Sequence, residues 1–260
     1  MIRKLSPVAL VAALALAACG TQGAPRIEDP EEILTQSVEA MSDVESVAFL
    51  LALDGEVTVA EMGGAMSLNG TELEGVLSLD GRAMKLTFSV PSFLGLSGEA
   101  RIVGDEAFFK TSMTGPLWIR QPVETGGEDP FAQAADPQAA LAQLREFLAR
   151  DGVQLEKLED VECGDGECYQ LRITIAGEVF AEEAGADVEV LGSVLEDGLT
   201  FDLQIDVDTL YMTGVSTAFE APDVGSLELT MTFDGFGDPV EVEAPPADEV
   251  TDDPGMLPLP

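Results

Sequence analysis

The feature that most constrains the fold is a strict alternation of apolar and polar residues in several short stretches. Between residues 199 and 207 every odd-numbered residue is apolar, and each residue between them is Thr, Asp or Gln. The same period of two recurs over residues 84–90 and 227–233. Alternation of this kind predicts β-strands with one apolar face and one face in water. A mainly β protein built on an antiparallel sheet is therefore expected.

Helical patterns interrupt the strands and supply a second apolar surface. Asp29-Pro30 has the residue types of a helix start, and apolar residues then recur at helical spacing as far as Met41. Asp136-Pro137 opens a second helix, and residues 179–197 suggest a loose helix or a helix-turn-helix. Because both layers must bury an apolar face, we expect a single α+β domain over residues 30–237, with the helices packed on a curved antiparallel sheet. Residues 238–260 are acidic, rich in Pro and without periodicity, which predicts a disordered tail.

The N-terminus has the pattern of an export signal. Arg3 and Lys4 precede an uncharged run, which closes in Leu16-Ala-Ala-Cys19-Gly20. A cysteine directly after small residues resembles a bacterial lipobox, in which Cys19 becomes the acylated first residue of the mature chain. The apolar run is shorter than the ~20 residues that a membrane-spanning helix needs. We therefore expect a signal peptide at residues 1–18, an acylated linker at 19–29 and a membrane anchor at Cys19.

Charge and composition exclude several classes of function. The formal net charge is −37, so no basic surface is available for nucleic acid. The chain has no histidine, which removes the commonest general base and neutral metal ligand. No nucleophile elbow, phosphate loop or dinucleotide fingerprint is present. Asp202, Asp206 and Asp208 could suggest calcium, but their alternation favours a solvated strand edge. We expect no catalytic residue, no metal, no cofactor and no enzymatic activity.

The two remaining cysteines, Cys163 and Cys168, lie in the sequence Cys-Gly-Asp-Gly-Glu-Cys. Disulfides persist in exported proteins, and these two thiols lack the further ligands that a zinc site requires. We expect a disulfide at the tip of a hairpin.

The apolar positions leave two alternatives open, because periodicity does not distinguish a packed core from the lining of a hollow. Flexible methionine and aliphatic side chains would suit an irregular apolar ligand. The candidate pocket residues are Val38, Met41, Met84, Leu86, Phe88, Leu141, Leu144, Leu148, Phe201, Leu203 and Ile205.

Three features together resemble the LppX/LprA/LprF/LprG family of bacterial cell-envelope lipoproteins. They are the lipobox followed by the segment 33–47, the segment 103–110 with Trp118 close behind, and Asp136-Pro-Gln followed by a helix and a hairpin that carries Cys168-Tyr169. The resemblance implies a half-barrel, a curved sheet with helices across its concave side, similar to that of LolA and LolB.

The same resemblance implies binding of an acylated lipid or glycolipid and its movement across the envelope. It places the protein outside the cytoplasm, lipid-anchored to the cell membrane or the outer membrane, with a membrane transporter as a further partner. The alternative is a non-catalytic structural or interaction lipoprotein that has the same fold and a filled core.

Overall fold

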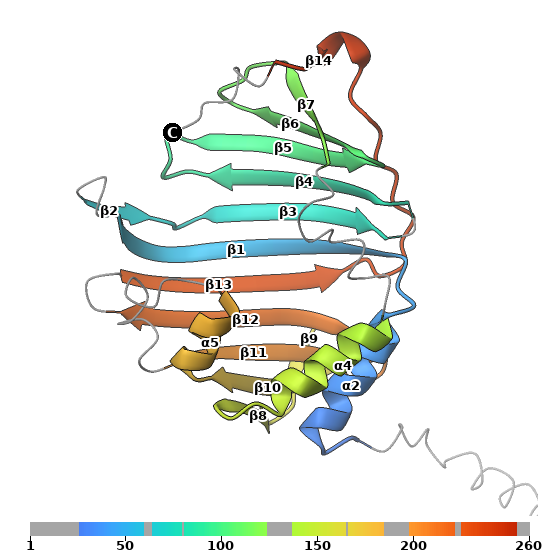
Figure 1. Cartoon of the computed structure of the whole chain (residues 1–260), viewed down its shortest axis with the longest axis vertical. Helices are drawn as coiled ribbons and strands as arrows, with labels where there is room; N and C mark the ends of the chain where they lie inside the picture. Colours follow the sequence, from blue (N-terminus) through green and yellow to red (C-terminus); the bar gives the residue numbers. More distant parts are fainter. Residues whose placement is uncertain are drawn as a thin grey trace, which may run out of the picture.

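The computed structural model describes residues 26–59, 64–79, 81–123, 137–164, 166–184, 198–221 and 225–253 (Figure 1). The strands within these ranges are β1 (Ser46–Val59), β2 (Gly64–Ser67), β3 (Thr71–Ser78), β4 (Ala83–Val90), β5 (Leu96–Val103), β6 (Glu106–Thr111), β7 (Trp118–Pro122), β8 (Val153–Lys157), β9 (Val161–Cys163), β10 (Gly166–Ile175), β11 (Leu199–Asp206), β12 (Met212–Ala221), β13 (Gly225–Asp234) and β14 (Val250–Thr251). The helices are α2 (Pro30–Met41), α4 (Pro137–Leu148), α5 (Gly177–Ala184) and the short 3-10 helix η2 (Ala247–Glu249).

All of these strands belong to one sheet. Its order is β14-β7-β6-β5-β4-β3-β1-β13-β12-β11-β10-β8, with β2 paired to β1 and β9 paired to β10. Two antiparallel meanders, β3 to β7 and β10 to β13, are joined through β1, which pairs with β3 on one side and β13 on the other. The two edge strands, β14 and β8, do not meet, so the sheet curls without closing (Figure 1). The predicted α+β half-barrel with a single antiparallel sheet is confirmed.

The first described helix begins where the sequence predicts. The Asp29 carboxylate accepts hydrogen bonds from the backbone N–H groups of Glu31 at 2.9 Å and Glu32 at 3.2 Å, and Pro30 occupies the first turn. These contacts satisfy N–H groups that have no partner within the helix. Met41 ends α2, close to the predicted boundary at Ser42-Asp43.

The helices lie over only one part of the sheet. In Figure 1, α2, α4 and α5 lie in front of the strands β8 and β10 to β12, which we call the covered half. No helix of the described chain lies over β3 to β7, which we call the open half. Helix α5 ends at Ala184, and the remainder of the predicted loose helix, residues 185–197, lies outside the described residues.

The predicted disulfide is confirmed. Cys163 and Cys168 are bonded to each other, with their Cα atoms 5.8 Å apart. They lie at the end of the β9–β10 hairpin, where Cys163 is opposite Gly166 and Cys168 is opposite Val161. A closed loop this short removes little entropy from the unfolded chain, so the bond mainly fixes the local register.

The C-terminal residues differ from the expectation of a disordered tail. Residues 238–253, the C-terminal strap, run along the ends of β1, β3, β4 and β5 to the far edge of the sheet (Figure 1). Ser46 Oγ donates to the carbonyl of Asp238 at 2.6 Å, and Arg101 Nη1 donates to that of Glu243 at 2.9 Å. Strand β14 then pairs in parallel with β7. Only two strap residues are in a strand, which is too short a segment to produce a visible sequence period.

Strand β1 continues through Asp54-Gly55, although Asp-Gly is a residue pair typical of turns. Gly55 has a φ of +128°, and a Cβ atom there would lie 2.2 Å from the carbonyl oxygen of Ser226 on β13. The glycine therefore allows close approach of two paired strands rather than a turn.

Candidate functional site

The strand register brings apolar residues from both meanders onto one face. Residues directly opposite each other in paired strands project to the same side of a sheet. One row crosses the sheet through Leu171, Leu203, Val215, Met231, Leu51, Leu73 and Phe88. A neighbouring row runs through Leu86, Ala100, Phe109 and Ile119. The sheet therefore carries one continuous apolar face, the same face on which the helices lie.

Under the helices this apolar face is a packed core. Ile33 and Leu34 of α2 pack against Tyr169, Leu171, Leu203 and Ile205 of β10 and β11. Ile33, Leu171 and Ile205 have no accessible surface. Leu144 and Leu148 of α4 pack against the same cluster. Space in this part of the molecule is already filled by side chains, so a ligand would have to displace a helix.

Over the open half and the adjoining strand β1, much of the same face stays partly accessible, although Ala100 and Ile119 on it are buried. The partly exposed apolar side chains are Phe49 and Leu51 of β1, Leu73 of β3, Met84, Leu86 and Phe88 of β4, Ile102 of β5 and Phe109 of β6. These residues lie on strands in the interior of a wide sheet, so their accessible surface belongs to the face of the sheet and not to its edge.

Two glycines shape the floor of the open half. A Cβ atom at Gly75 would lie 2.5 Å from Cζ of Phe49, and one at Gly98 would lie 2.5 Å from Cζ of Phe88. The two phenyl rings therefore lie across the neighbouring strands β3 and β5, in the space that a larger residue would occupy.

The eleven predicted pocket residues fall into separate environments. Leu203 and Ile205 are in the packed cluster, where Leu144 and Leu148 contact them, and Leu141 is buried. Phe201 packs beside Leu199, together with Phe180 and Phe219. Val38 and Met41 are partly exposed on α2. Met84, Leu86 and Phe88 lie on the open half.

Other residues of the open face were not among the predicted ones. Phe49 and Leu51 are in a long, nearly all-apolar segment, where the period of two is hidden by apolar residues on both faces. Phe109 follows another aromatic residue, Phe108, whose side chain is on the opposite face and is buried. An alternation signal could identify Met231 and Phe233, which continue the period that begins at Leu227.

The opposite face of the open half is polar and is contacted by the C-terminal strap. Lys85, Glu99 and Arg101 form adjacent ion pairs there, with Arg101 Nε 2.7 Å from Glu99 Oε1. The Arg101 guanidinium lies 4.7 Å from the centre of the Trp118 ring, and the Lys110 amine lies 5.5 Å from it. Trp118 is buried among these contacts. The charged side chains of this face therefore have a structural role.

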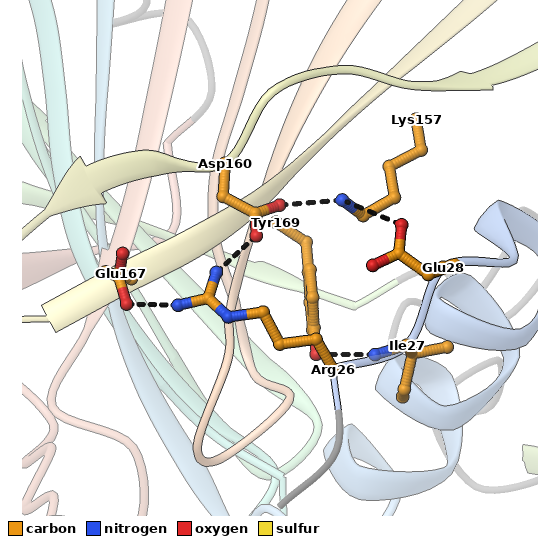
Figure 2. A network of polar contacts seen from close by, with 7 residues as sticks. All are labelled: Arg26, Ile27, Glu28, Lys157, Asp160, Glu167 and Tyr169. Atoms are coloured by element: carbon orange, nitrogen blue, oxygen red, sulfur yellow. Dashed lines mark hydrogen bonds and ion pairs between the residues drawn. The ribbon is translucent and has the colours of Figure 1, made fainter. Parts of the chain in front are cut away.

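The segment that leads from the predicted anchor into α2 is bound to the β9–β10 hairpin region (Figure 2). Arg26 forms ion pairs with both Asp160 and Glu167. The backbone N–H of Ile27 donates to the hydroxyl of Tyr169 at 3.1 Å. Lys157 Nζ lies 2.9 Å from Asp160 Oδ1 and 3.9 Å from Glu28 Oε2. The folded domain therefore begins at Arg26, seven positions after Cys19 in the sequence.

These contacts change the acidity of the groups involved. Burial by itself raises the pKa of Asp160, but hydrogen bonds from Lys157 and Arg26 outweigh it, and the pKa lies below its ordinary value of 3.8. The hydrogen bond that Arg26 donates to Asp160, followed by the one that it donates to Glu167, raises the pKa of Arg26. Both groups therefore remain charged throughout the neutral range.

The acidic residues considered for calcium have other partners. Asp202 forms a paired contact with the guanidinium of Arg172, at 2.7 and 2.8 Å. Asp206 Oδ1 accepts from the backbone N–H groups of Asp208 and Thr209, which stabilises the β11–β12 turn. Among the described residues, no group of three or more acidic or cysteine side chains is arranged to hold a metal ion. In the same part of the chain, none of the helices has the length and apolar character to cross a membrane.

Comparison with known proteins gives no match to a family model and none to a curated protein sequence. Solved structures do match. The lipoprotein LppX of Mycobacterium tuberculosis is 15% identical, with a TM-score of 0.50, over 82% of this chain and 97% of its own. LprF of Mycobacterium bovis is 14% identical, with a TM-score of 0.51, over 83% of this chain and 96% of its own.

A LolA-superfamily protein of Nitrosomonas europaea also matches, at 8% identity over 85% of this chain and 97% of its own. Its TM-score of 0.26 is too low to support an argument. The two stronger matches span nearly the whole length of LppX and LprF. The chain therefore has the fold of the lipoproteins LppX and LprF, and the resemblance expected from the sequence is confirmed at the level of the fold.

Proposed function

We propose that this protein is a membrane-anchored lipoprotein that binds an acylated lipid or glycolipid and carries or chaperones it in the cell envelope. The observation that carries the proposal is the open half of the sheet, where the apolar face continues beyond the helices and stays partly exposed. Soluble proteins rarely leave a contiguous apolar surface of this kind without a use for it.

An acyl chain is the ligand that this surface fits best. The open face is lined by aliphatic, phenyl and thioether groups, and its polar residues project from the opposite side of the sheet. Each CH₂ group of a ligand buried there would contribute about 0.8 kcal/mol. Contact of this kind favours a long hydrocarbon without specifying one structure. Flexible Met84 would allow the surface to adapt to chains of different shape.

The anchor supports the same function. An acylated Cys19 would hold the domain at the membrane that contains such lipids. The seven steps along the chain from Cys19 to Arg26 span at most about 25 Å when extended. Because Arg26 is paired with Asp160 and Glu167, that short tether would hold the covered half of the domain next to the bilayer.

The competing function is a non-catalytic structural or interaction lipoprotein with a filled interior. The specific observation in its favour is the cluster under α2 and α4, where Ile33, Leu171 and Ile205 are completely buried. That cluster accounts for the covered half alone. It leaves the accessible apolar residues of β3 to β6 without a structural role.

Identification of the bound lipid would test the proposal. Residues 19–260 with Cys19→Ser, which lack the signal and the acyl chains, are purified without detergent, extracted with organic solvent and analysed by mass spectrometry. We expect a lipid at a constant ratio to protein. A matched variant, Leu86→Asp, places a charge on the open face and should lose that lipid while remaining folded. If the parent protein with Cys19→Ser contains no lipid, even after incubation with envelope lipid extract, the structural function would be the better explanation.

A further inference from the structure

The most exposed large apolar side chains of the described residues gather at one place. Leu94 is 97% exposed and Phe93 is 44% exposed, both in the turn between β4 and β5. Met113, in the turn between β6 and β7, is 54% exposed. We call these three residues the apolar tip. Leu50, at 41%, is the other large apolar residue of comparable exposure and lies elsewhere, in the middle of β1.

The two turns are neighbours at the same end of the sheet. The backbone N–H of Ser112 donates to the carbonyl of Ser97 at 2.7 Å, and the N–H of Ser97 donates to the Ser112 hydroxyl at 3.3 Å. Ser97 is the second residue of β5, next to Leu96 at the base of the first turn, and Ser112 directly precedes Met113. The apolar tip is therefore one structural unit formed by two hairpins.

The backbone of the tip is well ordered by its own hydrogen bonds. Within the first turn, Gly95 N–H donates to Pro91 O at 3.1 Å and Leu96 N–H donates to Phe93 O at 2.9 Å. Within the second, Thr114 Oγ1 accepts from the backbone N–H of Thr111 at 2.9 Å. Polar groups that are bonded within a turn can enter a medium poor in water at lower cost.

Leu94 combines two unfavourable properties. Its side chain is almost completely in water, and its φ of +54° lies in the left-handed region that favours glycine or asparagine. Folding gains nothing from a leucine here, since a Gly or Asn would relieve the backbone strain and expose less apolar surface. Strain retained at an exposed position points to a function outside the folded domain.

Charge indicates what the tip contacts. Residues 89–98 and 111–119 contain no Asp, Glu, Lys or Arg, in a chain that has 49 acidic residues. These two turns can therefore approach an acyl layer without bringing a carboxylate of their own out of water, which is costly. The acidic Glu72 lies beside them on β3, where it is paired with Ser89. Three protruding side chains are also far fewer than the ~20–30 residues that each partner contributes to a stable protein interface.

The tip is continuous with the open half of the apolar face. Val90 and Leu96 pair at the base of the first turn and project to the same side as Phe88 and Leu86. We propose that the apolar tip inserts into the surface of a lipid bilayer, and that lipid passes between the bilayer and the open half over Val90 and Leu96. The insertion stands on the tip alone, whereas the passage of lipid rests on the function proposed above.

Vesicle flotation of residues 19–260 with Cys19→Ser tests the insertion. Two vesicle preparations are used, one of phosphatidylcholine alone and one with an equal part of phosphatidylglycerol. We expect the protein to float with both, and Leu94→Asn to lower the partition coefficient by about tenfold or more, since it removes one buried leucine from the membrane contact. The matched control, Leu50→Asn, removes an exposed leucine away from the tip and should float like the parent.

Two further readouts separate insertion from a loss of folding and from charge attraction. Leu94→Asn should unfold at the same or a higher temperature than the parent, because asparagine accepts a positive φ. Binding to the phosphatidylglycerol vesicles should rise with added salt, because salt screens repulsion between an acidic protein and an anionic surface.

A parent protein that does not float, or a Leu94→Asn variant that floats equally well, would overturn the proposal. The proposal would also be overturned if the parent does not float but self-associates, and if Leu94→Asn abolishes that self-association. The apolar tip would then be a contact between copies of the chain. If the protein floats as expected but no lipid is found by extraction, the proposed function is ruled out and the proposed insertion still holds.

Discussion

The two halves of the sheet have the same side-chain period and different surroundings. In the covered half, the residues of β10 and β11 meet α2 and α4, and Leu171 and Ile205 are completely buried. In the open half, Leu86 and Phe88 occupy equivalent positions on the same apolar face but remain partly exposed. The strand pattern alone therefore does not decide whether an apolar face becomes core or surface. The position of the helices decides it.

This difference assigns separate tasks to the two halves. The covered half supplies the buried apolar surface that stabilises a domain. The open half contributes less to stability, because its residues keep part of their contact with water in the folded state. We therefore expect equal substitutions in the two halves to have unequal effects on folding and on binding.

The largest difference should come from removing a leucine from each half. Leu171→Ala should destabilise the protein by about 2–5 kcal/mol, because it leaves a cavity in a completely buried cluster. Leu86→Ala should cost about 1 kcal/mol or less, since the side chain is partly exposed before the change. Urea unfolding of both variants measures the two values. Equal losses would show that the open half is packed as tightly as the covered one.

Enlarging a residue should separate stability from binding. Leu203→Trp should destabilise by about 1–3 kcal/mol through overpacking and leave lipid binding in the remaining folded protein unchanged. Leu86→Trp should have little effect on unfolding but should reduce the amount of lipid that co-purifies. Thermal unfolding and lipid extraction are measured on the same samples. The comparison fails if Leu203→Trp is the variant that loses lipid.

A smaller effect on stability is expected from a substitution at Gly75, in the floor of the open half, and a double variant serves as its control. Gly75→Ala should cost about 1–2 kcal/mol, because the new methyl group overlaps the Phe49 ring. Adding Phe49→Leu removes that ring, so the double variant should lose less stability than the sum of the two single variants. Strict additivity in urea unfolding would indicate that the ring does not lie over the glycine.

The smallest expected effect is a loss of local stability in acid near the two edges of the sheet. The hydrogen bond from Arg120 lowers the pKa of Asp252 from its ordinary value of 3.8, and that of Asp160 is lowered as well. A lowered folded-state pKa gives stabilisation that is present above the ordinary value and lost as the pH falls through the folded value. Both contacts should therefore weaken below about pH 4.

The consequences of acid should differ between the edges. Next to Asp160, helix α2 is still held by the buried Ile33 and Leu34, whereas β14 has only two paired residues beside Asp252. Amide hydrogen exchange should therefore speed up in β14 before it does in α2. Asp252→Asn should abolish the acid dependence at β14 while leaving that at α2 unchanged. Earlier exchange in α2 would contradict this ordering of the two edges.

Several local features follow from the sequence with no knowledge of the fold. Asp29-Pro30 places the start of α2 because a cap and a proline act within one helical turn. The alternation at residues 84–90 and 199–207 predicts β4 and β11 because a side-chain period of two depends only on the strand itself. The bond between Cys163 and Cys168 is predictable because the two residues are only five positions apart and the N-terminus has the pattern of an export signal.

The candidate site could be predicted only in part. Met84, Leu86 and Phe88 lie partly exposed on the open face, while Leu203 and Ile205, which have the same pattern, are in the core. The prediction of a disordered tail is wrong for residues 238–253. A two-residue strand and single contacts, such as that of Arg120 with Asp252, produce no periodic pattern in a sequence.

The sequence by itself determined that β4, β11 and β13 are strands with one apolar face, and where α2 and α4 begin. These properties depend on neighbours within a few residues. Only the tertiary structure decided that β1 pairs with β13, that the helices cover one half of the sheet, and that two distant turns form the apolar tip. Contacts between segments far apart in the chain depend on how the whole sheet curls, which no local pattern encodes.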